Sequence, residues 1–152
     1  GIWRGNSPRI HLTITMPRHL ALEIDDGSGD IEIRNLNNAI ELDDASGDTT
    51  LLAIQGNIKI EDGSGDLTIQ DVSGSVTLDD GSGELNIYNV SGDVDIIDGS
   101  GDLSVESAGG LVTIDDGSGN IEVRSAGSLK IIDSGSGELN IVKIKHGVEI
   151  QS

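Results

Sequence analysis

An acidic, glycine-rich turn recurs every 18 residues, and this interval constrains the fold more than any other feature of the chain. The glycines that close the turns are Gly29, Gly47, Gly65, Gly83, Gly101, Gly119 and Gly137, and a serine precedes each of them. The interval holds without a single insertion. A fixed period of this length indicates a repeat architecture, in which each unit packs only on its neighbours.

The aliphatic residues follow the same period, in pairs that are two positions apart. Two ladders begin at Ile31 and Ile33, and two more begin nine residues later at Ile40 and Leu42. A spacing of two is the alternation of a β-strand, with the mostly polar residues between facing water. A fifth ladder, which begins at Leu36, is expected to turn inward at a corner. Each unit therefore predicts two short strands.

Strands this short cannot bury a face alone, but identical units can stack about 4.8 Å apart. The sequence predicts an all-β fold, a parallel β-solenoid with 18-residue coils and two short strands per coil. The general bias of parallel crossovers predicts a right-handed one. Within one domain, residues 1–24 are expected to form an N-terminal cap and lead strand, with a strand in Ile10–Pro17, and residues 25–152 a seven-coil solenoid. The thin interior explains the absence of Phe and the single Trp and Tyr.

Charge and composition narrow the choice of partners. The formal net charge is −18, from 27 acidic and nine basic residues, so nucleic acid is repelled and is not expected as a partner. No apolar run reaches the ~18 residues of a membrane span, so no membrane insertion is expected. Cysteine is absent, which excludes disulfides and thiol chemistry. Lys143, Lys145 and His146 give the last coil positive charge, and its uncapped edge leaves end-to-end self-association through the C-terminal coil open.

Stacking would turn the acidic turns into columns of carboxylates. The first column consists of Asp26, Asp44, Asp62, Asp80, Asp98 and Asp116, and Ser134 ends it. The second contains Asp25, Asp43, Glu61, Asp79, Asp115 and Asp133, with Ile97 interrupting it. The third contains Asp30, Asp48, Asp66, Glu84, Asp102, Asn120 and Glu138. Neighbouring carboxylates about 5 Å apart repel by about 1 kcal/mol in water, so something must offset the charge.

Two interpretations of these columns stay open. In the first, turn N–H groups donate to the carboxylates and salt screens the rest. In the second, the rows bind Ca²⁺, which prefers oxygen ligands. The calcium-binding nonapeptide of β-rolls places Asp two residues after the last glycine, where this chain has Ile31 and its equivalents. The sequence therefore predicts no cofactor and no metal site, with Ca²⁺ as the alternative.

Nothing in the repeat differentiates a catalytic group. A catalytic site needs residues whose surroundings push their pKa values apart, whereas these turns repeat one aspartate in equivalent places. His11, His19 and His146 are scattered without metal-ligand spacing. We therefore predict no catalytic residues and no enzyme. One coil is irregular, because counting by 18 puts Lys130 in an apolar slot and Ile131 in an outward one; a bulge or register shift is expected there.

The stretch "MPRHLALEIDDGSGDIEIRNL", with "SGSVTL", "SGDVDI" and "GGLVTI" further on, resembles a bacterial family of unknown function. That family carries the label of β-strand-repeat adhesins and is related to the head domains of auto-transporter adhesins. The resemblance covers roughly Ile10–Ile150 and implies a periplasmic, cell-surface or secreted protein. We expect a rigid, non-catalytic structural or adhesin-like interaction module of the cell envelope, with an unidentified protein or glycan surface as partner. The alternative is a calcium-dependent binder of carbohydrates or surfaces that uses the acidic turns.

Overall fold

The computed structural model describes residues 2–5, 11–14, 22–26, 30–37, 39–44 and 46–151. This part of the chain contains fifteen strands and no helix, so nothing in it meets the length and apolarity of a membrane-spanning helix. The strands are β1 (Ile2–Gly5), β2 (His11–Ile14), β3 (Leu22–Asp26), β4 (Asp30–Leu36), β5 (Ile40–Asp44), β6 (Thr49–Ile54), β7 (Ile58–Asp62), β8 (Leu67–Val72), β9 (Val76–Ser82), β10 (Leu85–Val90), β11 (Val94–Ser100), β12 (Leu103–Ala108), β13 (Leu111–Asp116), β14 (Ile121–Asp133) and β15 (Leu139–Ile150).

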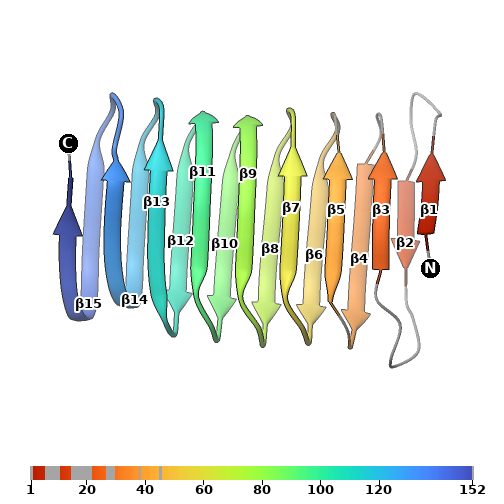
Figure 1. Ribbon diagram of the computed structural model, residues 1–152, viewed down its shortest axis with the longest axis horizontal. Coiled ribbons are helices and arrows are strands. Elements are labelled where there is room, and N and C mark those ends of the chain that lie inside the picture. The colour runs from red at the N-terminus through yellow and green to blue at the C-terminus, as the bar shows by residue number, and fades with distance from the viewer. Residues whose placement is uncertain are drawn as a thin grey trace.

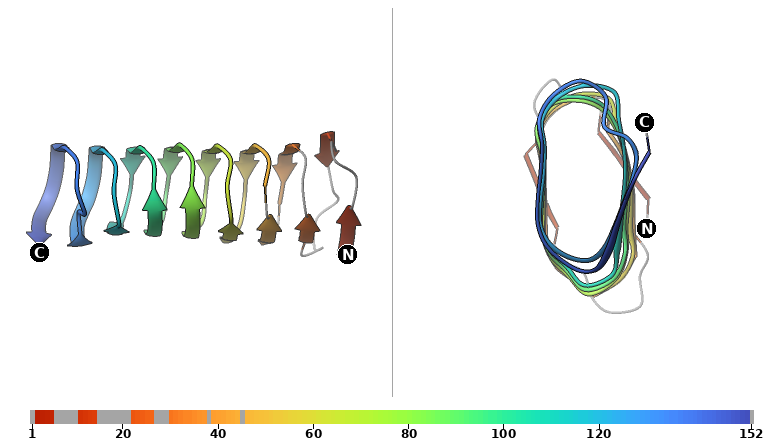
Figure 2. Two further views of the ribbon diagram at one scale, coloured as in Figure 1. Left: turned by 90° about the horizontal axis from the view of Figure 1, so that it is seen from above. Right: turned by 90° about the vertical axis from the view of Figure 1, so that its left-hand side faces the viewer.

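The strands stack in parallel, in two faces that run the length of the molecule (Figure 1). The odd-numbered strands from β1 to β13 form one face, and the even-numbered strands from β2 to β12 form the other, with β14 contributing to both. Seen along the axis, the coils superpose on one flattened outline (Figure 2). Ile33, Leu51 and Ile69 lie in register on successive strands. The parallel solenoid with 18-residue coils is confirmed, with about six turns rather than the seven expected; its handedness stays a prediction.

The interior between the two faces is aliphatic. Each even strand from β4 to β12 buries three ladder positions, and Ile31, Ile33 and Leu36 on β4 are typical. The odd strands from β5 to β13 bury two more, such as Val76 and Leu78 on β9. Where side chains are described, all the buried hydrophobic residues are Ile, Leu, Val or Ala, and the β-branched residues among them suit a pleated, tightly stacked surface. The thin, ring-free core that the ladders predicted is confirmed.

A left-handed residue makes one corner of every described coil. The residues other than glycine with positive φ, between 56° and 70°, are Asn35, Ala53, Asp71, Asn89, Ser107, Ser125 and Lys143. Each is passed over by the strand pairing; Arg34 pairs with Leu52 and Leu36 with Ile54, for example. This residue breaks the alternation, so that Leu36, three positions after Ile33, also points inward. The inward turn of the fifth ladder is thereby confirmed.

The irregular coil shifts register, as expected, but two ladder assignments based on strict counting are wrong. Leu129 and Ile131 are buried, whereas Ile132 is 41% exposed and Lys130 is not an interior residue. Leu111 pairs with Ser128, only 17 residues on, and Asp115 with Asp133, again 18 on. One residue is therefore lost at the corner before Ser128 and recovered at a bulge at Ile132, which moves the aliphatic side chains Leu129 and Ile131 inward.

The N-terminal segment continues the same stack. β1 pairs with β3 and β2 pairs with β4, both in parallel. The strand expected within Ile10–Pro17 is present as β2, and it covers the first regular coil. The offset from His11 to its partner Asp30 is 19 residues, so this coil departs from the period of the others. The division of the chain at residue 24 stays a prediction.

Candidate functional site

The first acidic column lies inside the solenoid. The exposed fractions of Asp62, Asp80, Asp98 and Asp116 are 5%, 1%, 2% and 0%. Each is the third inward residue of an odd strand, two positions after an aliphatic ladder residue. Asp26 and Asp44 pair in the same register, but their side chains lie outside the described part. The prediction that salt water screens this column is wrong for these four, because strand alternation turns their carboxyl groups inward.

Burial changes the protonation of these acids. It raises the pKa of Asp80 to about 7, that of Asp98 to about 8 and that of Asp116 to about 6. Neighbouring carboxylates raise the values further; for Asp98 these are Asp80 and Asp116. Backbone N–H groups two residues on lower them, and Ser118 N donates to Asp116 Oδ1 at 3.2 Å. The charged form is poorly solvated inside, so near neutral pH part of the column is protonated.

Several carboxyl oxygens of the buried column lack a hydrogen-bond partner. They are both oxygens of Asp80, both of Asp98, and Oδ2 of Asp116. The backbone N–H group of Ser82 lowers the pKa of Asp80, and that of Ser100 lowers the pKa of Asp98. Neither N–H group has the geometry of a hydrogen bond to the carboxyl oxygens. A buried ionised carboxylate without partners is costly, and a proton reduces that cost. In the described residues, no three His, Cys, Asp or Glu side chains converge as a metal site requires.

The third column is exposed and bonded along the stack. Asp48 N donates to Asp30 Oδ1 at 3.0 Å, and Asp66 N donates to Asp48 Oδ1 at the same distance. The pattern recurs in later coils, where Asn120 N donates to Asp102 Oδ1 at 3.1 Å. These charge-assisted bonds link neighbouring coils at several steps of the column. The first interpretation, in which backbone N–H groups compensate the acids, is confirmed for this column.

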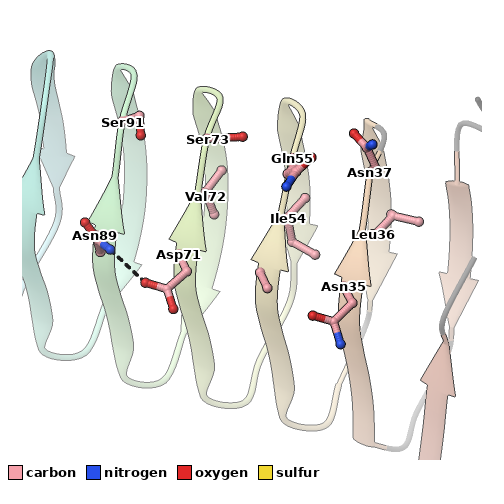
Figure 3. A pocket seen from close by; sticks show the side chains of 11 residues that line it. Asn35, Leu36, Asn37, Ile54, Gln55, Asp71, Val72, Ser73, Asn89 and Ser91 are labelled. Carbon is pink, nitrogen blue, oxygen red and sulfur yellow. Dashed lines mark hydrogen bonds between the residues drawn. The ribbon is translucent and has the colours of Figure 1, made fainter. Parts of the chain in front are cut away.

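A groove that the sequence reasoning missed follows the left-handed corner (Figure 3). This corner groove, of about 640 Å³, is lined by Asn35, Leu36, Asn37, Ala53, Ile54, Gln55, Asp71, Val72, Ser73, Asn89 and Ser91. Asp71 is the only charged residue among them. Asn89 Nδ2 donates to Asp71 Oδ1 at 2.7 Å, so these two side chains are linked across adjacent coils. Asn or Asp at positions 35, 71 and 89 was the available signal, because these types tolerate positive φ.

Comparison with known proteins identifies the domain type. The family model described as Toastrack DUF4097 matches residues 2–149, nearly the whole chain. It represents an uncharacterised family with a solenoid-like fold. Neither the curated proteins nor the solved structures contain a significant match. The resemblance noted from the repeat motifs is thus confirmed for the solenoid fold and the unknown-function family, while the link to adhesins stays a prediction.

Proposed function

Because the chain belongs to the Toastrack DUF4097 family, we propose that it is a rigid, non-catalytic module that scaffolds or contacts other molecules. The observation that supports this is the unbroken register from β3 to β13. Stacking in register presents the same kinds of groups at every coil. Such a surface suits contact with an extended partner, whereas a catalytic site needs a few residues in different surroundings.

We further propose that the partner is a protein or glycan surface and that the module works in the bacterial envelope, at the periplasm or cell surface, or after secretion, in an adhesin-like role. The envelope location rests on the motif resemblance alone. The acidic composition argues against nucleic acid as the partner.

Two measurements test this proposal. The full-length gene product, tagged in its own bacterium, is expected in the envelope or culture fluid and to be cleaved by protease added to intact cells or spheroplasts. Beads coated with the purified chain are expected to retain envelope fragments better than beads coated with an unrelated acidic protein. Recovery only from the cytosol would overturn the location, and equal retention on both beads would overturn the interaction role.

A second candidate is the calcium-dependent binder of carbohydrates or surfaces. Two observations favour it: the unpartnered buried oxygens of Asp80 and Asp98, and a hollow of about 320 Å³ that includes Glu84, Asp102 and Glu138 in its lining. If Ca²⁺ holds the coils together, EDTA should lower the melting temperature by many degrees and added Ca²⁺ should restore it. An unchanged melt at low salt would remove this candidate.

End-to-end self-association through the C-terminal coil is a further proposal. Val148 and Ile150 on β15 are 46% and 52% exposed, because β15 pairs with β14 alone. Sedimentation velocity of the wild type against Ile150→Lys tests it. We expect the wild type to form concentration-dependent assemblies that the added charge disperses, and a wild type that stays monomeric would contradict the proposal.

A further inference from the structure

One part of the solenoid surface carries little charge, although the chain has 27 acidic residues. The uncharged outward side chains of three neighbouring strands, β6, β8 and β10, make up this neutral face: Thr50, Leu52, Thr68, Gln70, Asn86 and Tyr88. Asp71, at the corner of β8, is the one charged residue on these three strands. The ion pairs Arg34–Glu32 on β4 and Arg124–Glu122 on β14 lie beyond it on either side. The outward residues of the opposite strands include Glu41, Asp43, Lys59, Glu61, Asp79, Asp95 and Asp115. The neutral face therefore contrasts with the rest of the surface.

The neutral face and the corner groove form one continuous surface. A hollow of about 290 Å³ is lined by Gln70, Tyr88, Asn89, Glu106 and Ser107, and Asn89 also lines the corner groove. In Figure 3 the lining side chains follow successive strands along the axis, in rows that include Asn35, Asp71 and Asn89. Tyr88, which is partly exposed, is the one aromatic side chain in the part of the chain whose side chains are described.

The chemistry of this surface fits neutral sugar units. Asn, Gln, Ser and Thr side chains both donate and accept hydrogen bonds, as sugar hydroxyls do. The ring of Tyr88 and the side chain of Leu52 offer apolar contact to the C–H faces of a sugar ring. Because few charges are present, few ions lose their hydration when a ligand covers the surface. An anionic polymer would meet the field of the −18 net charge, and a cationic partner would be drawn to the exposed acidic columns instead.

The repeat favours a polymer over a small molecule. Coils about 4.8 Å apart offer similar groups again and again along the axis. We propose that the neutral face and the corner groove bind a neutral polysaccharide chain that lies along the solenoid. This inference rests on the proposed interaction role and assigns it a site and a ligand class. It differs from the calcium-dependent candidate in both respects, because the site avoids the acidic turns and requires no metal.

Co-sedimentation of the purified chain with insoluble neutral polysaccharides (cellulose, chitin and mannan), in buffer with EDTA, tests the proposal. Binding to at least one of them is expected, with the acidic polymer alginate unable to compete. Tyr88→Ala is expected to weaken binding about tenfold, as loss of one aromatic contact would. Asn89→Gly is expected to weaken it as well, and glycine keeps the left-handed backbone that Asn89 adopts. Thr77→Ala, on the opposite face, is the matched control and should bind like the wild type.

The possible results separate this inference from the proposed function. If no neutral polysaccharide binds, or if both variants bind like the wild type, the inference is wrong, while envelope fragments can still be retained on coated beads. Binding that requires Ca²⁺ or an acidic glycan would also overturn it, in favour of the acidic turns. A dimer that Tyr88→Ala disperses would show that a second copy covers the face. Melting curves show whether Tyr88→Ala and Asn89→Gly fold. If one of them does not, the binding of the other variant tests the inference.

Discussion

Asp98→Asn is the sharpest test of the buried acid column. The side chain of Asp98 is 2% exposed, and burial, with Asp80 and Asp116 beside it, raises its pKa from 3.8 to about 8. Asparagine has nearly the shape of the protonated acid but cannot ionise. The substitution therefore leaves the folded state at low pH almost unchanged and removes the cost of ionisation at high pH.

The sign of the pH effect follows from linkage. Below a pH of about 4 the carboxyl group is protonated in both the folded and the unfolded chain, so its contribution to stability is fully present. As the pH rises, the unfolded chain releases this proton first, and stability falls until the pH passes the folded pKa of about 8. At 1.36 kcal/mol per pKa unit, the loss between about pH 5 and pH 8 is about 4 kcal/mol for this one group. That is a large part of a typical stability of about 5–15 kcal/mol.

Urea unfolding at fixed ionic strength, followed by far-ultraviolet circular dichroism, measures the effect. We expect the wild type to lose stability from about pH 5 to pH 8, and Asp98→Asn to lose about 4 kcal/mol less. Acids with ordinary pKa values near 4 are already ionised in this window. Asp95→Asn is the matched control, because Asp95 lies on the same strand but is exposed. Parallel pH curves for the wild type and Asp98→Asn, or the same gain from Asp95→Asn, would refute the reasoning.

Three further substitutions test the stacking itself, each by urea or thermal unfolding. Ile87→Ala removes a fully buried ladder side chain and should cost about 3–4 kcal/mol. Gly101→Ala would place a Cβ 2.0 Å from the backbone oxygen of Gly83, at a φ of +113°, and should cost at least about 3 kcal/mol. Asp102→Ala removes the acceptor for Asn120 N and should cost about 1 kcal/mol.

Each of these substitutions has a control or a contrary outcome. Thr77→Ala, on the outer face, is the control and should change the free energy of unfolding by less than about 0.5 kcal/mol. If Ile87→Ala also changed it by no more than this, the ladder of buried side chains would not be tightly packed. A Cβ at Gly147 would have no neighbouring atom within 4 Å, so Gly147→Ala should be tolerated. If Gly101→Ala were tolerated equally well, the close approach of adjacent coils would be refuted. An unchanged melt for Asp102→Ala would show that water replaces its bond.

The fold was predictable because stacking in register turns distance along the chain into position in space. Ile33, Leu51 and Ile69 are 18 residues apart, and they lie side by side on successive strands. The left-handed corner was harder to predict. Asn35 and Asp71 are types that tolerate positive φ, but Ala53 and Lys143, at equivalent places, carry no such signal. The neighbouring coils impose the conformation on them.

The candidate site was predicted only in part, for two physical reasons. The polarity of Asp62 and Asp80 indicated an outward position, yet strand alternation continues past the aliphatic ladder and turns both inward. A buried charge can avoid its cost by taking up a proton, and sequence patterns do not show that protonation. The corner groove and the neutral face were missed because they depend on which side chains adjoin across strands, such as Gln70 and Tyr88.

The lost residue beside Gly127 and the extra residue at Ile132 show how this architecture absorbs changes in length. The shortened corner turns Leu129 and Ile131 inward. Without the bulge, the residues that follow Ile132 would be one position out of phase, and the bulge restores the original phase within the same strand. Viable insertions and deletions should therefore occur as compensating pairs within one coil or as whole coils of 18. The solenoid can therefore lengthen or shorten by gain or loss of whole coils. The insertion or deletion of a single residue within a strand is tolerated only with a compensating change nearby.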